Sequence, residues 1–108
     1  MTVMASAEPC SERSKLVWII AESGTEEPVM ELLAELGLEH YTRFQQIEGS
    51  GETGHKQGNA IFPGINMVIM IAMDEDLVEP LVMRLHEIRD AFIVRPGMRV
   101  IVTDCVMY

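Results

Sequence analysis

The stretch INMVIMIAM, residues 65–73, constrains the fold most, because apolar side chains occupy every position except Asn66. Neighbouring side chains of a β-strand point to opposite faces of the sheet, so a strand of this composition has to be covered on both sides. In a small two-layer domain, helices cover one face. We expect another subunit to cover the second face.

Three more segments have the composition of strands. Residues 14–21 form a compact run rich in β-branched and aromatic side chains, and residues 40–47 alternate imperfectly between apolar and polar side chains. Residues 98–106 follow a Pro-Gly turn and contain Cys105, which we expect to lie in the core. Together with residues 65–73, these segments predict four strands.

The first of two amphipathic helices follows the first strand. Thr25 is expected to cap its start, and Gly37 is expected to end it. The apolar residues between them recur at helical spacing and form one face. They are Val29, Leu32, Leu33 and Leu36.

The second helix follows residues 65–73. Asp76 and Glu79 have the spacing of a capping box, and Pro80 is expected to remove one backbone hydrogen bond near the start. Its apolar stripe consists of Leu77, Leu81, Leu85 and Ile88.

The resulting order, β-α-β-β-α-β, predicts an α+β fold, the ferredoxin-like sandwich. The second and third strands form a hairpin whose connection, residues 49–64, is several times longer than usual hairpin loops. Long loops of this kind in compact domains are often functional. We expect one domain over residues 15–108, preceded by a disordered segment over residues 1–14.

Composition excludes several classes of partner. A formal charge of -9 argues against nucleic acid and against an anionic membrane surface, because both require a basic face. No apolar run is long enough for a transmembrane helix, and residues 1–14 lack the features of a signal peptide. We therefore expect a cytoplasmic protein whose two cysteines are free thiols.

Two motifs stand out. The first is GSGETGHK, residues 49–56, which leads into the long loop; its glycines allow a backbone nest that can hold an anion. The second is DEDLVEPLV, residues 74–82, at the start of the second helix. Together with the β-α-β-β-α-β order, they resemble the PII signalling family, and the resemblance covers about residues 15 to 106.

The resemblance implies a cytoplasmic homotrimer for signal transduction and nitrogen regulation. Its adenine nucleotide would bind in clefts between subunits, at the base of the long loop. The loop, similar to the family's T-loop, would contact a transporter or an enzyme. The ligand-binding residues that the resemblance and the loop chemistry indicate are Gly49, Gly51, Gly54, His55, Lys56 and Arg99.

The sequence also departs from the family. The segment before the last strand, residues 91–97, is short where PII proteins have a loop rich in glycine and lysine. The identity of the ligand therefore stays open. It is a nucleotide with fewer phosphates, a different small ligand, or no ligand at all.

Two other functions are compared with this one. A metal-responsive module similar to CutA, with His55 as a ligand, is the alternative, although no His or Cys pair has zinc-ligand spacing. An enzyme is not expected, because the sequence has no Gly-x-Ser-x-Gly elbow and no supported nucleophile-base arrangement.

Overall fold

The structure, a computed structural model, describes residues 13–48 and 65–108. Residues 1–12 and 49–64 lie outside the described part, and with them most of the predicted N-terminal segment and the whole predicted loop. The elements in chain order are β1 (Ser14–Glu22), the 3-10 turn η1 (Ser23–Thr25), α2 (Glu26–Glu35), β2 (Tyr41–Glu48), β3 (Ile65–Asp74), the 3-10 turn η2 (Glu75–Leu77), α3 (Val78–Asp90) and β4 (Met98–Asp104).

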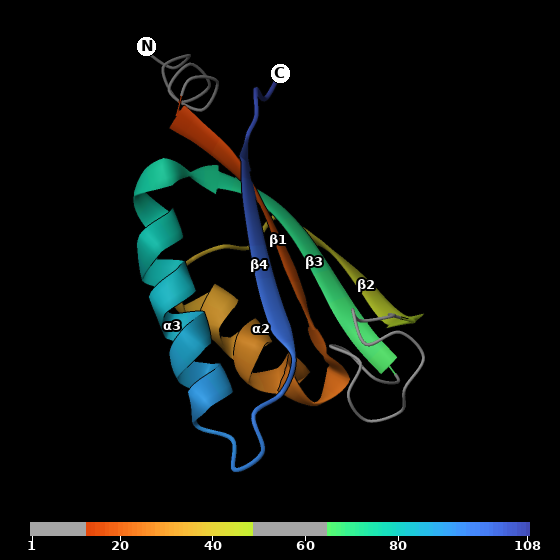
Figure 1. The fold of residues 1–108 in the computed structure, drawn as a ribbon. Helices are drawn as coiled ribbons and strands as arrows, with labels where there is room; N and C mark the ends of the chain where they lie inside the picture. The colour runs from red at the N-terminus through yellow and green to blue at the C-terminus, as the bar shows by residue number, and fades with distance from the viewer. Residues whose placement is uncertain (1–12, 49–64) are drawn as a thin grey trace.

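The four strands form one antiparallel sheet in the order β2-β3-β1-β4. Figure 1 shows α2 and α3 together on one side of this sheet. The predicted ferredoxin-like sandwich is therefore confirmed. Neither α2 nor α3 has the length and apolar character that a membrane-spanning helix needs.

The hydrophobic core lies between the sheet and the two helices. β1 and β3 pair so that Val17 lies opposite Ile71 and Ile19 opposite Ile69, and all four side chains are buried. The helices supply the predicted stripes. The buried helix residues are Val29, Leu32 and Leu33 of α2 and Leu81 and Leu85 of α3, while Leu36, Leu77 and Ile88 pack against them with part of their surface exposed.

The two ends of α2 follow different rules. Gly37 has a φ of 75° and closes a C-terminal motif in which Leu38 N donates to Leu33 O at 2.8 Å, as predicted for a terminating glycine. Thr25 occupies the predicted N-cap position, but the predicted side-chain cap is wrong, because its hydroxyl donates to Glu22 O at 2.8 Å instead of accepting from the helix. The preceding 3-10 turn, η1, buries Thr25 and turns its hydroxyl back toward β1.

The start of α3 also differs from the prediction. Asp74, and not Asp76, caps this region by accepting from Asp76 N at 2.8 Å. Because the α-helix begins at Val78, Pro80 lies in the first turn, where a missing N–H removes no helical bond.

The edge strands shift slightly from their predicted bounds. β2 runs over 41–48, and a bulge at Gln46, whose φ is 59°, shifts its register with β3 between Gln45 and Ile47. β4 ends at Asp104, two residues before the predicted end. Cys105 therefore follows the strand and is only partly buried, so its predicted core position is wrong.

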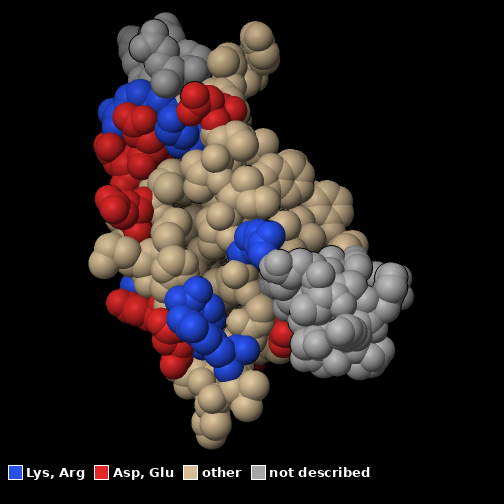
Figure 2. Space-filling model, in the orientation of Figure 1, with Lys and Arg blue, Asp and Glu red and all other residues tan. Residues whose placement is uncertain are grey.

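The second face of the sheet has no helix over it in the described part of the chain. The strand registers place these mostly apolar residues on it: Leu16, Trp18 and Ile20 of β1, Thr42 and Phe44 of β2, Val68, Met70 and Ala72 of β3, and Ile101 of β4. We call this surface the open face. Figure 2 shows that most of the side turned to the viewer is neither acidic nor basic, and that acidic groups gather along the side where α3 lies.

Candidate functional site

The end of the sheet from which the chain leaves toward residues 49–64 holds one row of residues from all four strands or their neighbours. Ile47 of β2 lies opposite Asn66 of β3, which in turn lies opposite Glu22 of β1. Gly97, just before β4, completes the row, because Glu22 N donates to Gly97 O at 3.1 Å and Gly97 N donates to Glu22 Oε2 at 3.1 Å. We call this the loop-base end of the sheet. Hydrogen bonds and strand pairing connect all four strands there.

A small hollow of about 240 Å³ opens at the same end, beside the β2 bulge. Its polar lining includes the buried Asn66, whose Nδ2 donates to Ile47 O at 3.1 Å. Amide and hydroxyl groups of this kind can both donate and accept hydrogen bonds, so the hollow suits a polar ligand group. The lining residues are Ser23, Glu26, Gln45, Gln46, Asn66 and Met67.

Glu26, at the first position of α2, joins the helix to β2. Its Oε2 accepts from Arg43 Nη1 at 2.9 Å and from Gln45 Nε2 at 2.5 Å. Both partners precede the bulge at Gln46, so a single carboxylate positions the strand segment that leads to the loop base. A charged acceptor makes these hydrogen bonds stronger than neutral ones.

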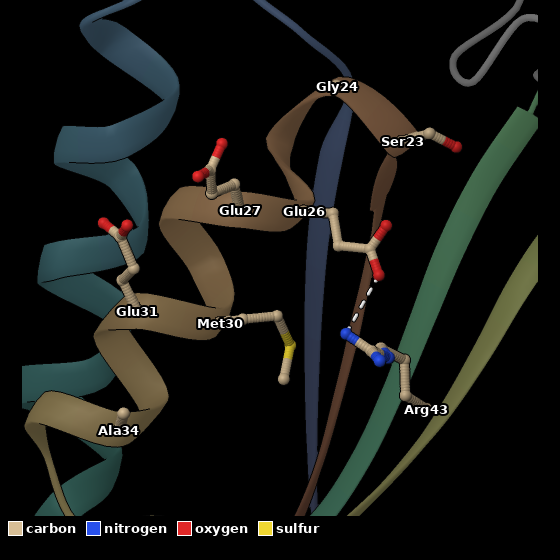
Figure 3. Close-up of a pocket in the computed structure, with 8 residues that line it drawn as sticks. All are labelled: Ser23, Gly24, Glu26, Glu27, Met30, Glu31, Ala34 and Arg43. Carbon is tan, nitrogen blue, oxygen red and sulfur yellow. Dashed lines mark ion pairs between the residues drawn. The ribbon is translucent and has the colours of Figure 1, made fainter.

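A larger and shallower hollow of about 650 Å³ lies between α2 and β2. Figure 3 shows Met30 pointing from α2 into it and the Glu26–Arg43 ion pair at one side. Glu27 and Glu31 of α2 border the hollow and are exposed, and neither has an ion-pair partner among the described residues. We call this the α2 hollow; it combines an apolar floor with an acidic rim.

Of the six ligand-binding residues predicted from the sequence, the structure describes only Arg99. Gly49, Gly51, Gly54, His55 and Lys56 lie within residues 49–64, outside the described part. Arg99 is exposed on the open face of β4 and lies opposite Ile20. The position of β4 in the sheet therefore determines which strands the Arg99 side chain can contact.

Arg99 on β4 and the strand β2 are on opposite edges of the sheet. The registers place Arg99, Ile20, Val68 and Phe44 in one row across β4, β1, β3 and β2. With about 4.8 Å between neighbouring strands, the backbones of β4 and β2 are about 14 Å apart. The sheet of one subunit consequently does not bring Arg99 to the strand that leads into residues 49–64.

The described residues give no support to a metal site. No group of three or more His, Cys, Asp and Glu side chains in the described ranges is arranged to hold an ion. His40 and His86 are exposed, and His55 lies outside these ranges.

Sequence reasoning did not identify the Glu26, Arg43 and Gln45 cluster. An acidic residue at the start of a helix is already explained by the helix dipole, and the contacts of Glu26 with β2 join residues about twenty positions apart. The available signal was that Arg43 and Gln45 lie two residues apart, on one face of the strand, which the register places on the side of the buried Ile69 and Met67.

Several solved structures of PII-like proteins have a fold similar to that of this chain. CPII, a nitrogen regulatory PII-like protein from Thiomonas intermedia K12 bound to ADP, AMP and bicarbonate, is 25% identical, with 88% of this chain and 92% of that chain covered and a TM-score of 0.69. A putative PII-like signaling protein from Thermus thermophilus is 27% identical, with coverage of 82% and 83% and a TM-score of 0.56. PII from Arabidopsis thaliana, bound to citrate, shares the fold at 16% identity, with coverage of 88% and 79% and a TM-score of 0.65.

Two comparisons of the sequence gave different results. None of the curated proteins compared with the chain matches it. The family model described as nitrogen regulatory protein P-II matches residues 14–103, which is nearly the whole described domain. The chain therefore belongs to the nitrogen regulatory protein P-II family.

Proposed function

We propose that this protein is a trimeric signalling protein that senses a small ligand in clefts between subunits. Its segment 49–64 then regulates a partner protein, a transporter or an enzyme. The role is regulatory and not catalytic. Membership of the P-II family supports this proposal.

The observation that carries the proposal is the combination of the open face and Arg99. An open face that exposes Phe44 and Ile101 leaves apolar surface in water unless another subunit covers it. Arg99 lies on this same face, on the edge strand β4, so packing of open faces also brings Arg99 to a boundary between subunits. Packing around a common axis therefore covers the apolar surface and places Arg99 at the proposed clefts.

Adenine nucleotides are the ligand class to test first. CPII from Thiomonas intermedia K12, whose fold this chain shares, is bound to ADP, AMP and bicarbonate. In this chain, every described arginine except Arg99 already has a carboxylate partner; the five paired arginines are Arg13, Arg43, Arg84, Arg89 and Arg95. Arg99 has no such partner among the described residues, which favours a ligand with few phosphates.

The oligomer is tested by measuring mass in solution with light scattering. We expect a trimer at micromolar concentration, and we expect Phe44→Asp on the open face to dissociate it by placing a charge in the interface. Met83→Asp is the matched control, because Met83 is an exposed methionine on α3. A wild-type monomer at these concentrations would refute the trimer.

The ligand is tested with a thermal-shift panel of AMP, ADP, ATP, bicarbonate and divalent metal ions. A ligand that binds only the folded protein raises the melting temperature. We expect AMP or ADP to give the largest shift and Arg99→Ala to remove most of it, whereas Arg84→Ala, on α3 beside Glu35, leaves it unchanged. A shift with metal ions alone would support the CutA-like alternative.

A further inference from the structure

Gln46 of β2 has a backbone conformation that is unusual for its residue type. Its φ of 59° lies in the left-handed region, which a residue with a Cβ adopts at a cost equivalent to about a tenfold change in population. In the part of the chain that the structure describes, Gln46 is the one residue other than glycine with a positive φ. Such conformations persist where the surrounding structure holds them, and they are frequent at functional sites.

The bulge also changes the surroundings of Gln46. Neighbouring residues of a regular strand face opposite sides of the sheet. Gln45 lies opposite the buried Met67, on the side of the helices, so a regular strand would put Gln46 on the open face. Gln46 instead lines the hollow of about 240 Å³ together with Gln45, Met67 and Glu26; we call this the loop-base hollow. Bulges are common next to functional sites, where they redirect a side chain.

The carboxylate of Glu26 holds the chain immediately before Gln46. Its Oε2 accepts from Arg43 Nη1 at 2.9 Å and from Gln45 Nε2 at 2.5 Å. The Glu26 and Arg43 side chains are only 29% and 34% exposed, so water screens their attraction less than it screens a fully exposed pair. Figure 3 shows Glu26 reaching from the start of α2 to Arg43.

The two ends of this arrangement are fixed by other contacts. Thr25, which precedes Glu26, is fully buried, and its hydroxyl donates to Glu22 O at 2.8 Å. On the far side of Gln46, the buried Asn66 donates from Nδ2 to Ile47 O at 3.1 Å. The Glu26 carboxylate therefore pulls on β2 from a rigid base, and the chain beyond the bulge is anchored separately.

We infer that Glu26 is a positioning residue for ligand binding at the loop base. By holding Arg43 and Gln45, it keeps Gln46 in the left-handed conformation and preserves the shape of the loop-base hollow. Without the carboxylate, Gln46 returns to an ordinary strand conformation in most molecules. The apparent affinity for a ligand falls with the fraction of molecules that keep the competent conformation. The inference rests on the proposed function for the identity of that ligand.

The first test measures nucleotide affinity by calorimetry, with AMP or ADP, whichever binds the wild type more tightly. We expect Glu26→Ala to weaken binding by about tenfold, which is the population cost of the left-handed conformation. In a Gln46→Gly background the same change should weaken binding by no more than about twofold, because glycine adopts this conformation readily. Glu79→Ala is the matched control, since Glu79 is an exposed glutamate in the first turn of the other helix, α3.

Unchanged affinity in Glu26→Ala, or equal weakening in both backgrounds, would overturn the inference, because the lost carboxylate would then act independently of Gln46. Circular dichroism and light scattering check that the fold and the mass of the variants match the wild type.

The second test needs no ligand and compares melting temperatures. Gln46→Gly relieves strain only where Glu26 imposes it. Its effect on the melting temperature should therefore be more favourable by several degrees with Glu26 present than in Glu26→Ala. Comparing the two backgrounds cancels the general cost of a glycine in a strand.

An equal effect of Gln46→Gly in both backgrounds would overturn the positioning role of Glu26, even if nucleotides bind. A wild type that binds neither AMP nor ADP would refute the proposed ligand. In that case, and if Gln46→Gly itself abolishes binding, the melting temperatures decide the role of Glu26 on their own.

Discussion

Glu22 and Gly97 are joined by two hydrogen bonds, one between their backbones and one from Gly97 N to the Glu22 carboxylate, each 3.1 Å long. This pair fixes the end of β1 to the start of β4. It also anchors the connection between α3 and β4 at the loop-base end, where the Glu22 side chain adds one hydrogen bond to the backbone pairing.

Glu22→Ala should therefore destabilise the fold. The Gly97 N–H loses a charged acceptor, and we expect the free energy of unfolding to fall by about 1–2 kcal/mol. Urea denaturation at pH 7 measures the change. Glu27→Ala is the control, since Glu27 is exposed and has no ion-pair partner among the described residues. Equal effects of the two variants would contradict the role of Glu22.

Gly37→Ala should also destabilise the protein. The φ of 75° is costly for alanine, and the expected loss is about 1–2 kcal/mol in the free energy of unfolding. Gly24→Ala is a matched control, because a Cβ there meets nothing within 4 Å and no positive φ is required. Thermal melting should separate the two variants; similar melting temperatures would refute the assignment of Gly37 as the residue that ends α2.

Leu81→Ala or Leu85→Ala should cause a larger loss. Both side chains are fully buried between α3 and the sheet, and removing such a leucine side chain costs about 2–5 kcal/mol. Met83→Ala, on the exposed side of the same helix, should change stability by no more than about 0.5 kcal/mol. Chemical denaturation of the three variants checks the orientation of α3 directly.

Asp104 should give stability a measurable dependence on acid pH. Its hydrogen bond from Lys15 Nζ, 2.5 Å long, holds the pKa of Asp104 below its usual range. A carboxylate with a lowered pKa in the folded state stabilises the protein above its unfolded pKa, and this contribution is lost as the pH falls through the folded pKa.

We therefore expect Asp104→Asn to reduce the fall in melting temperature between pH 7 and pH 3, with the difference arising below about pH 4. The effect is small because the pair is on the surface. Glu39→Gln, at an exposed glutamate outside the helices and strands, is the control. Identical pH profiles for Asp104→Asn and the wild type would exclude the contribution.

Local patterns in the sequence determined the elements of this protein. The spacing of Val29, Leu32 and Leu33, and of Leu81 and Leu85, predicted which helix faces are buried, and the apolar run over residues 65–73 predicted a strand. The order of these elements then predicted the ferredoxin-like sandwich. Such patterns are readable because side-chain periodicity follows directly from helix and strand geometry.

Tertiary structure decided the contacts between distant parts of the chain. Neither the approach of Glu26 to Arg43 and Gln45 nor the placement of Arg99 at the edge opposite β2 can be derived from spacing along the sequence. The predicted side-chain caps at Thr25 and Asp76 were wrong for a related reason, since a 3-10 turn precedes each helix and redirects the local hydrogen bonds. Periodicity reports which face of an element is buried, but strand order and register determine which side chains meet.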